Sequence, residues 1–174
     1  MVYVVAFIVA GLDQAIKWLV TTHMALNSAV PVWPGVVELL YVQNRGAAFS
    51  ILLNQRVLLT VVAFFVIGVI IYADRRYARG KRGLQAALGM LLGGAIGNLI
   101  DRIRLGYVVD YVYIEIIRYY PVFNLADSCI VLSVVYLVYR AWRSRATILA
   151  KDAGGGPADG NRLPPVPEEA DDAK

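Results

Sequence analysis

Cysteine and histidine are almost absent from this chain of 174 residues, in which Cys129 and His23 are the single example of each. One cysteine excludes a fold held together by disulfide bonds. One cysteine and one histidine are also too few for a zinc site of the usual kind, which takes most of its ligands from these two residue types. Disulfide scaffolds and zinc centres are therefore removed from the candidate classes.

Charged residues are also few, at 17% of the sequence, while 59% is hydrophobic and the mean hydropathy is +0.58. Soluble domains average about 25% charged and about 45–50% apolar residues, so this composition is that of a membrane protein. A helix that crosses a bilayer needs roughly 20 mostly apolar residues. Four crossings with their connections use about 150 residues, which leaves no room for a large soluble domain.

Four apolar stretches are long enough to cross the bilayer. The first is interrupted by Asp13, Gln14 and Lys17, the second has no charged residue, and the third is rich in glycine. The sequence therefore predicts an all-α membrane domain over residues 1–151, with four transmembrane helices at about residues 1–20, 57–73, 84–101 and 122–140.

Lysine and arginine are concentrated beside two of these stretches. Residues 74–82 hold five basic side chains in nine positions, and the last stretch is followed by Arg140, Arg143, Arg145 and Lys151. Basic loops stay on the cytoplasmic side, so we expect both termini in the cytoplasm and the segments 21–56 and 101–121 outside. The basic side chains flank apolar spans, which fits an anionic lipid surface and indicates no nucleic-acid partner.

The C-terminal residues 152–174 differ in composition from the rest. They hold six acidic residues against two basic ones, a net charge of −4 that leaves +8 on residues 1–151. They also contain the glycine- and proline-rich runs 154–157 and 164–167. We expect a disordered cytoplasmic tail, because this segment is too polar and too broken to pack.

The two outer segments are more than simple loops. Residues 36–42 are apolar and β-branched, and Pro31, Pro34 and Gly35 bound them on one side, so they predict a strand in a small extracytoplasmic β-sheet. Residues 107–120 mix aromatic and β-branched residues with charges, a pattern that fits either a strand or a short helix in the membrane interface.

Polar residues inside the spans are costly, at about 3 kcal/mol for a charge at the bilayer centre. In the first span, Asp13 and Lys17 lie four residues apart on one helix face and can pair. A structural ion pair is a simpler interpretation of these two residues than a direct catalytic role.

The third span carries two features. Its small-residue stripe allows another helix to approach closely and consists of Gly89, Gly93 and Gly97. At its outer end, Asn98, Asp101 and Arg102 share one side of the helix. A structural network and direct contact with a substrate both fit that arrangement.

An acidic residue near the start of the fourth span carries the chemical argument. Pro121 suits the first turn of a helix, so Asp127 would lie about one and a half turns inside it, with Asn124 on the same face. Gly106 permits a turn that brings Asp110 back over this helix end. Two carboxyl groups held close cannot both ionise, so one keeps a proton and the other acts as a base. Such a pair can activate water and protonate a peptide carbonyl or leaving amine without a metal or cofactor.

Five segments of the sequence resemble lipoprotein signal peptidase, or signal peptidase II, in order and spacing: residues 13–17 (DQAIK), 44–49 (NRGAAF), 93–102 (GGAIGNLIDR), 106–110 (GYVVD) and 123–127 (FNLAD). The resemblance covers about residues 13–130. It implies an intramembrane aspartyl peptidase of the bacterial inner membrane, which removes the signal peptide of prolipoproteins just before a diacylglyceryl-modified cysteine. Departures from the family pattern are the acidic, proline-rich tail and a first span that begins without a charged lead.

The resemblance also implies roles for individual residues. Asp110 and Asp127 match the catalytic pair, with no metal or cofactor. The positions matched to substrate binding are Asn44, Asn98, Arg102 and Asn124. The positions matched to supporting roles are Asp13, Lys17, Gly46 and Asp101. We expect Tyr41, Phe49 and Tyr111 to close over the substrate's peptide bond. The expected partners are diacylglyceryl-modified prolipoproteins and membrane lipid, bound by a monomer.

Two other classes stay open from the residues alone. A small proton-coupled transporter also carries intramembrane acids, but it places them near the midplane, often in two repeated halves. Here the acids gather at the outer end, and the sequence has no internal repeat. A structural membrane subunit explains the glycine stripe but leaves the cost of burying Asp127 unexplained. The roles of Arg45 and Cys129 stay open.

Overall fold

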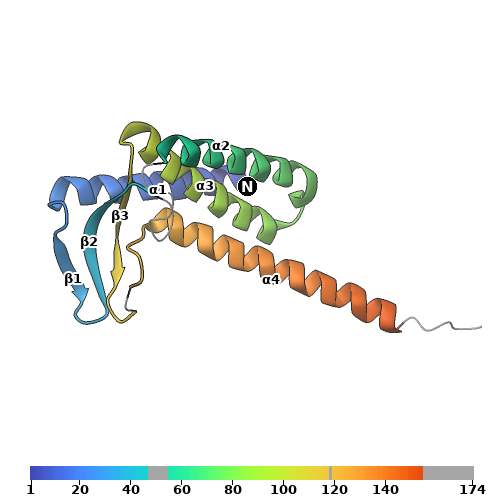
Figure 1. Cartoon of the computed structure of the whole chain (residues 1–174). Helices are drawn as coiled ribbons and strands as arrows, with labels where there is room; N and C mark the ends of the chain where they lie inside the picture. The colour runs from blue at the N-terminus through green and yellow to red at the C-terminus, as the bar shows by residue number, and fades with distance from the viewer. Residues whose placement is uncertain (47–54, 118, 155–174) are drawn as a thin grey trace, which may run out of the picture. The chain divides into compact units, whose positions relative to one another are not determined.

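Four long helices form the body of the protein. The computed structural model describes residues 1–46, 55–117 and 119–154. Over these ranges the helices are α1 (Val2–His23), α2 (Arg56–Ala73), α3 (Arg82–Arg104) and α4 (Leu125–Gly154), and a π-helical segment (Asp74–Ala78) follows α2 (Figure 1). All four are long and apolar enough to cross a membrane. The predicted fold class is therefore confirmed.

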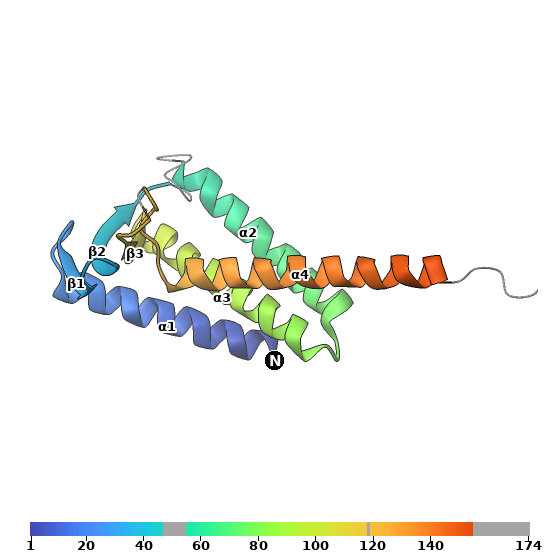
Figure 2. The same ribbon diagram turned by 90° about the horizontal axis from the view of Figure 1, so that it is seen from below.

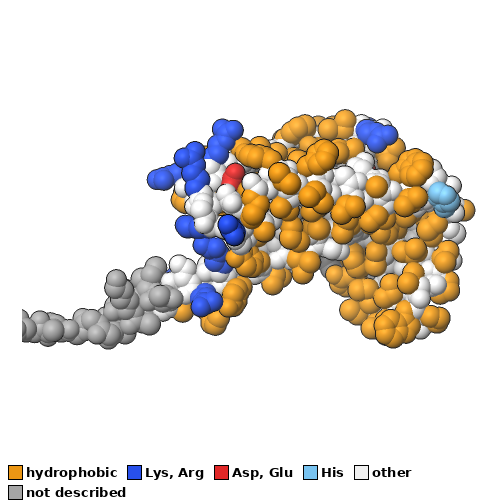
Figure 3. Space-filling view, turned by 180° about the vertical axis from the view of Figure 1, so that it is seen from behind, with side chains coloured by type: hydrophobic (Ala, Val, Ile, Leu, Met, Phe, Trp, Pro, Cys, Tyr) orange, Lys and Arg blue, Asp and Glu red, His pale blue; other side chains and the backbone are white. Residues whose placement is uncertain are grey.

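The outward faces of these helices are apolar. Phe7 on α1 is 81% exposed, and Val57 and Phe65 on α2 are 77% and 72% exposed. Hydrophobic side chains cover most of the helical surface seen in Figure 3. A monomeric soluble protein does not expose so much contiguous apolar surface, so this surface faces lipid.

The glycine stripe of α3 packs closely against another helix, as the sequence predicts, and that helix is α1. A methyl group added at Gly89 would come within 2.7 Å of Val5, and one added at Gly93 within 2.7 Å of the Ala6 carbonyl oxygen. The next glycine on the stripe, Gly97, faces the carboxylate of Asp13. Close approach of the two backbones is what brings the polar residues of α1 and α3 together.

This packing predicts the effect of single methyl groups on stability. We expect Gly93→Ala to destabilise the fold by about 1–3 kcal/mol, because backbone atoms of α1 would have to move. The matched control is Gly68→Ala on α2, where nothing lies within 4 Å of the added carbon, so the change is expected to be neutral or slightly stabilising. Thermal unfolding in detergent measures both, and equal melting temperatures for the two variants would contradict the close packing of α1 and α3.

A three-stranded antiparallel sheet lies at the end of the helices farthest from the N-terminus (Figures 1 and 2). Its strands are β1 (Ala29–Trp33), β2 (Val37–Asn44) and β3 (Val108–Ile114), in that order. β2 matches the predicted strand, and β3 settles the alternative for residues 107–120 in favour of a strand. β1 was not predicted, because Pro31 read as a boundary; an edge strand tolerates proline, and the register shifts between Pro31 and Trp33.

The fourth helix starts later and ends later than predicted. Phe123 pairs with Val112 at the edge of the sheet, and the helix begins at Leu125. The placement of Pro121 in the first helical turn was therefore wrong, and Asp127 lies within the first turn. α4 continues to Gly154, since no glycine or proline interrupts residues 141–153.

The chain divides into two compact units, residues 1–138 and 139–174. The second unit holds the helical continuation of α4 as far as Gly154. The prediction of a disordered tail over residues 152–174 was wrong for residues 152–154, which are helical. Residues 155–174 lie outside the described residues.

Candidate active site

Asp110 is a buried carboxyl group on β3, with 2% of its surface exposed. The turn before β3 is made by Gly106, whose φ of +84° is a conformation that suits glycine. Asn44 lies opposite Val108 in the sheet and so diagonally across from Asp110. The Asn44 Nδ2 group donates a hydrogen bond to Oδ2 of Asp110 (2.9 Å), and Asn124 Nδ2 donates to Oδ1 (2.7 Å).

Asp127 is fixed by the start of α4. Asn124 precedes the helix, and its Oδ1 accepts a hydrogen bond from the Asp127 amide (2.9 Å). In return the Asn124 amide donates to Asp127 Oδ2 (3.3 Å), which completes a reciprocal capping box. Asn98 Nδ2 on α3 donates to the other oxygen, Oδ1 (2.8 Å). Asn124 therefore contacts both carboxyl groups and joins β3 to α4.

The orientation of three asparagine amides follows from their other partners. The Asn44 Oδ1 atom accepts from the Gly46 amide, Asn124 Oδ1 accepts from the Asp127 amide, and Asn98 Oδ1 accepts from Lys17 Nζ. Each amide thereby turns its NH₂ group toward a carboxyl oxygen. We call Asp110 and Asp127 the carboxyl pair, since all four of their oxygens accept a hydrogen bond.

The carboxyl pair is coupled electrostatically. Burial, and after it the negative charge of Asp127, raise the pKa of Asp110 to about 7, against the lowering effect of the hydrogen bonds from Asn44 and Asn124. A carboxyl group with a pKa near neutrality can hold or release a proton at physiological pH. The two groups therefore meet the requirement for an acid and a base side by side.

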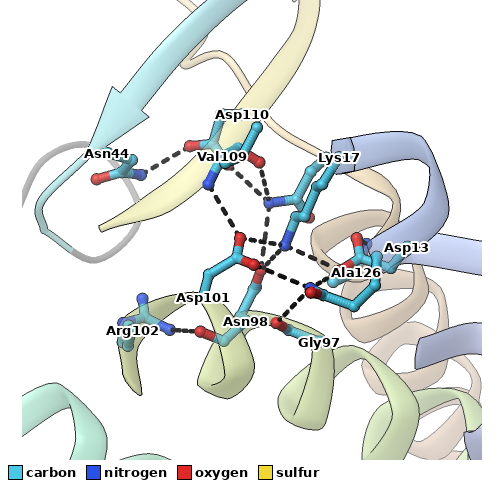
Figure 4. A network of polar contacts seen from close by, with 12 residues as sticks. Asp13, Lys17, Asn44, Gly97, Asn98, Asp101, Arg102, Val109, Asp110 and Ala126 are labelled. Carbon is cyan, nitrogen blue, oxygen red and sulfur yellow. Dashed lines mark hydrogen bonds and ion pairs between the residues drawn. The ribbon is translucent and has the colours of Figure 1, made fainter. Parts of the chain in front are cut away.

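Asp13, Lys17 and Asp101 form a buried charge cluster that lies close to Val109 and Asp110 (Figure 4). Lys17 Nζ is 2.9 Å from Asp13 Oδ2 and 2.9 Å from Asp101 Oδ2, so the predicted pair of Asp13 and Lys17 is confirmed and gains a third member. The same ammonium donates to Asn98. All three residues of the cluster are at most 3% exposed.

Each carboxylate of the charge cluster holds the residue that precedes a member of the carboxyl pair. Asp13 Oδ1 accepts a hydrogen bond from the amide of Ala126 (3.0 Å). Asp101 Oδ2 accepts from the amide of Val109 (3.0 Å). These bonds tie the backbone before Asp127 and before Asp110 to one ammonium group, which gives Asp13, Lys17 and Asp101 a positioning role.

Arg102 and Gly46 lie at the edge of the site. Arg102 Nη2 donates to the Gly46 carbonyl (3.3 Å), and its Nη1 donates to the carbonyl of Asn98 (3.4 Å). The carboxylates of Asp127 and Asp110 act on the guanidinium through their charge. Among the described residues, the recorded hydrogen bonds of Arg102 all go to backbone carbonyls, so this side chain is less tightly held than the asparagines.

Sequence reasoning gave no role to Gln14, and it gave Tyr111 a role different from the one that the structure shows. Gln14 Nε2 donates to Asp101 Oδ1 (2.9 Å) and to the Gly97 carbonyl; its position between Asp13 and Lys17 was the available signal. The Tyr111 hydroxyl accepts from the Leu125 amide at the start of α4 (3.1 Å), and burial raises the pKa of this phenol to about 12.

The expected lid over the substrate is not formed by the two tyrosines. Tyr41 and Tyr111 are 6% and 5% exposed and pack in a core cluster with Val20 and Val109. They stabilise the contact between the sheet and α1 and have no free face toward a peptide bond. The third expected lid residue, Phe49, lies outside the described residues.

Comparison with known proteins gives consistent matches along the chain. The family model described as signal peptidase (SPase) II matches residues 5–143. A protein of Halothermothrix orenii named lipoprotein signal peptidase is 46% identical over 144 residues, which covers 82% of this chain and 96% of that one. A lipoprotein signal peptidase of Shouchella clausii is 46% identical over 134 residues, or 77% and 87% of the two chains.

Solved structures share the fold. One, described as a bacterial membrane enzyme determined by the in meso method at 2.3 Å resolution, superimposes with a TM-score of 0.81 and 26% identity, over 84% of this chain and 90% of that chain. A second, described in the same words at 1.9 Å, gives 0.75 and 27% over 80% and 91%. The four helices and the sheet therefore belong to an arrangement already known in membrane enzymes.

Proposed function

Because this chain belongs to the signal peptidase II family of aspartic-type peptidases, we propose that it removes signal peptides from prolipoproteins by cutting before a diacylglyceryl-modified cysteine. The observation that carries the proposal is the carboxyl pair, two acids joined through Asn124 at the sheet end of a four-helix membrane domain. Asp110 and Asp127 are the proposed catalytic residues. The proposed substrate-binding residues surround them and are Asn44, Asn98, Asn124 and Arg102.

The two acids take different parts in peptide hydrolysis. Asp127 is the less buried of the pair, and we assign it the role of base: it accepts a proton from water as the oxygen attacks the scissile carbonyl carbon. Asp110 holds the proton, since its pKa is raised, and donates it to the carbonyl oxygen. When the tetrahedral intermediate collapses, the carbon–nitrogen bond breaks and the leaving amine takes the proton from Asp127. Asp110 takes back a proton from one hydroxyl of the intermediate as the new carbonyl forms, so both acids return to their starting states.

The membrane places the reaction at one surface. Basic side chains gather at the end of the helices away from the sheet, over the segment between α2 and α3 (Figure 3). The positive-inside rule supports a cytoplasmic position for that end and for the N-terminus. The sheet and the carboxyl pair then lie near the outer face of the bacterial cytoplasmic membrane, and the apolar signal helix enters laterally from the lipid.

The direct test uses purified full-length protein with a diacylglyceryl-modified prolipoprotein. We expect a product that begins at the modified cysteine, identified by mass spectrometry. The matched substrate carries the same sequence without the lipid, and it should be cut far more slowly. Equal cleavage of both substrates would contradict the lipid requirement, and no cleavage of either would contradict the proposed function.

The pH dependence follows from the raised pKa of Asp110. The proposed mechanism needs Asp110 protonated, and this form is present below its pKa and lost as the pH rises through about 7. We expect kcat/KM, which reports the free enzyme, to fall on the alkaline side with a midpoint within about one unit of pH 7. A flat profile from neutral to strongly alkaline pH would exclude Asp110 as the proton donor.

Metal removal is expected to leave cleavage unchanged. The proposed chemistry moves protons between water, the substrate and two carboxyl groups, and no step uses a Lewis acid. Within the described residues, no group of three or more His, Cys, Asp or Glu side chains is arranged to hold a metal ion. The measurement is kcat/KM with and without excess EDTA. A loss of activity that an added divalent metal restores would count against this mechanism.

A further inference from the structure

A cavity of about 310 Å³ lies between the end of α3 and the start of α2, outside the carboxyl pair and the charge cluster. Its described lining residues are Arg45, Arg56, Leu105, Gly106 and Tyr107. Two of these five carry a guanidinium group, and none of them carries a carboxylate. The walls therefore favour a negatively charged occupant.

Arg56 is held rigidly at one wall. Its Nε donates to the Arg102 carbonyl and its Nη2 to the Ile103 carbonyl, both at 2.8 Å. These are backbone oxygens of the last turn of α3, so the side chain also caps that helix. The remaining Nη1 lies beside Gly106, where an added methyl group would come within 3.3 Å of it. A guanidinium fixed on one edge leaves donors directed by its planar geometry toward a ligand.

Arg45 supplies the second charge. It follows β2, it is exposed, and the structure records no hydrogen bond or ion pair for its side chain among the described residues. Beside it lies the Tyr107 hydroxyl, whose pKa is raised by burial and by Tyr41, to which it is hydrogen-bonded, so this phenol is uncharged. The cavity thus offers two cations and a neutral hydroxyl.

The residues near Arg56 and Leu105 in the sequence are apolar and exposed. Val57 and Leu58 on α2 are 77% and 45% exposed, and Ile103 and Leu105 at the end of α3 are 51% and 43% exposed. Both helices are long and apolar enough to cross the membrane, so their ends lie at headgroup depth. The anion expected at this depth, with apolar surface beside it, is a lipid headgroup whose acyl chains would lie along the exposed side chains.

We propose that this cavity binds the phosphate group of an anionic membrane phospholipid between Arg45 and Arg56. Guanidinium groups bind phosphate oxygens through paired, charge-assisted hydrogen bonds. The site is separate from substrate chemistry, because the lipid on the proposed substrate is a diacylglyceryl group without phosphate. It is a structural lipid site where the start of α2 lies beside the end of α3.

The test measures lipid binding to the full-length protein in detergent by native mass spectrometry. The probe is dioctanoyl phosphatidylglycerol, and dioctanoylglycerol and inorganic phosphate are the two comparison ligands. We expect the double variant R45Q/R56Q to bind the phospholipid at least about tenfold more weakly than the unchanged protein. The matched control, R75Q/R79Q, removes two exposed arginines from the segment between α2 and α3 and should bind it normally.

Single variants separate lipid binding from folding. Arg56 caps α3, so R56Q can weaken the fold itself, whereas R45Q removes a side chain without a recorded structural bond and should alone reduce binding. Equal phospholipid binding by R45Q/R56Q and the unchanged protein would overturn the proposal. Equal binding of dioctanoylglycerol would also overturn it, since acyl contact would then suffice. Competition by inorganic phosphate at the same concentration would overturn the assignment to a lipid.

Discussion

Replacing either Asp110 or Asp127 with asparagine is expected to lower kcat/KM for signal-peptide cleavage by about 10³-fold or more. Asparagine keeps the size of the side chain but can neither hold the transferred proton nor accept one from water. Each carboxyl group accepts a hydrogen bond on both oxygens. The amide offers one acceptor in their place, so one donor loses its partner, at a cost of about 1–2 kcal/mol.

The fold should survive that cost, which makes the loss of activity interpretable. Both variants should insert into membranes and unfold within a few degrees of the unchanged protein. The matched control is Glu115→Gln, which makes the same chemical change on an exposed acid just after β3 and should retain full activity. The double variant Asp110→Asn/Asp127→Asn should be little worse than either single variant, since the pair acts as a unit. Substantial cleavage by either single variant would end the proposal that the two acids form a catalytic pair.

Local patterns in the sequence predicted the main elements because their physical causes are local. Apolar stretches of spanning length indicated the four helices, and a β-branched run indicated β2. Spacing alone placed Asp13 and Lys17 on one face, where Nζ and Oδ2 lie 2.9 Å apart. The stripe of glycines on α3 predicted a close helix neighbour, although spacing could not show that the neighbour is α1.

Elements that depend on distant partners could not be predicted in the same way. β1 contains Pro31 and forms only because β2 offers an edge to pair with. The start of α4 is set by Asn124 and by the pairing of Phe123 with Val112, a contact between residues eleven positions apart. These contacts outweigh the local preference of Pro121 for a first helical turn.

The hydrogen bonds of the site depend on the orientation of its asparagine amides, which residue spacing does not determine. Sequence and family resemblance could name Asn44, Asn98 and Asn124 as site residues. Which way each amide points depends on the donors behind it: two backbone amides and the ammonium of Lys17. The anchoring of Ala126 by Asp13 likewise joins residues more than a hundred positions apart.

Replacing Lys17 with methionine is expected to be the most destabilising single change in the molecule. The ammonium is 3% exposed and donates to Asp13, Asp101 and Asn98, each at 2.9 Å. Methionine fills a similar volume but leaves two buried carboxylates without their positive partner. Removing one partner of a buried ion pair costs about 3–5 kcal/mol. Thermal unfolding in detergent or lipid nanodiscs should show this as a large drop in melting temperature.

Two further variants distinguish a buried charge imbalance from a general loss of packing. Lys81→Met changes an exposed lysine between α2 and α3 and should leave the melting temperature unchanged. In the Lys17→Met background, adding Asp101→Asn removes one of the two stranded carboxylates, so we expect it to restore part of the lost stability, although the same substitution alone should destabilise the protein. Opposite signs for one substitution in two backgrounds require direct coupling between the residues. If Asp101→Asn instead lowered stability equally in both backgrounds, the charge cluster would not be the origin of the loss, and its role in holding the backbone before Asp110 would fail with it.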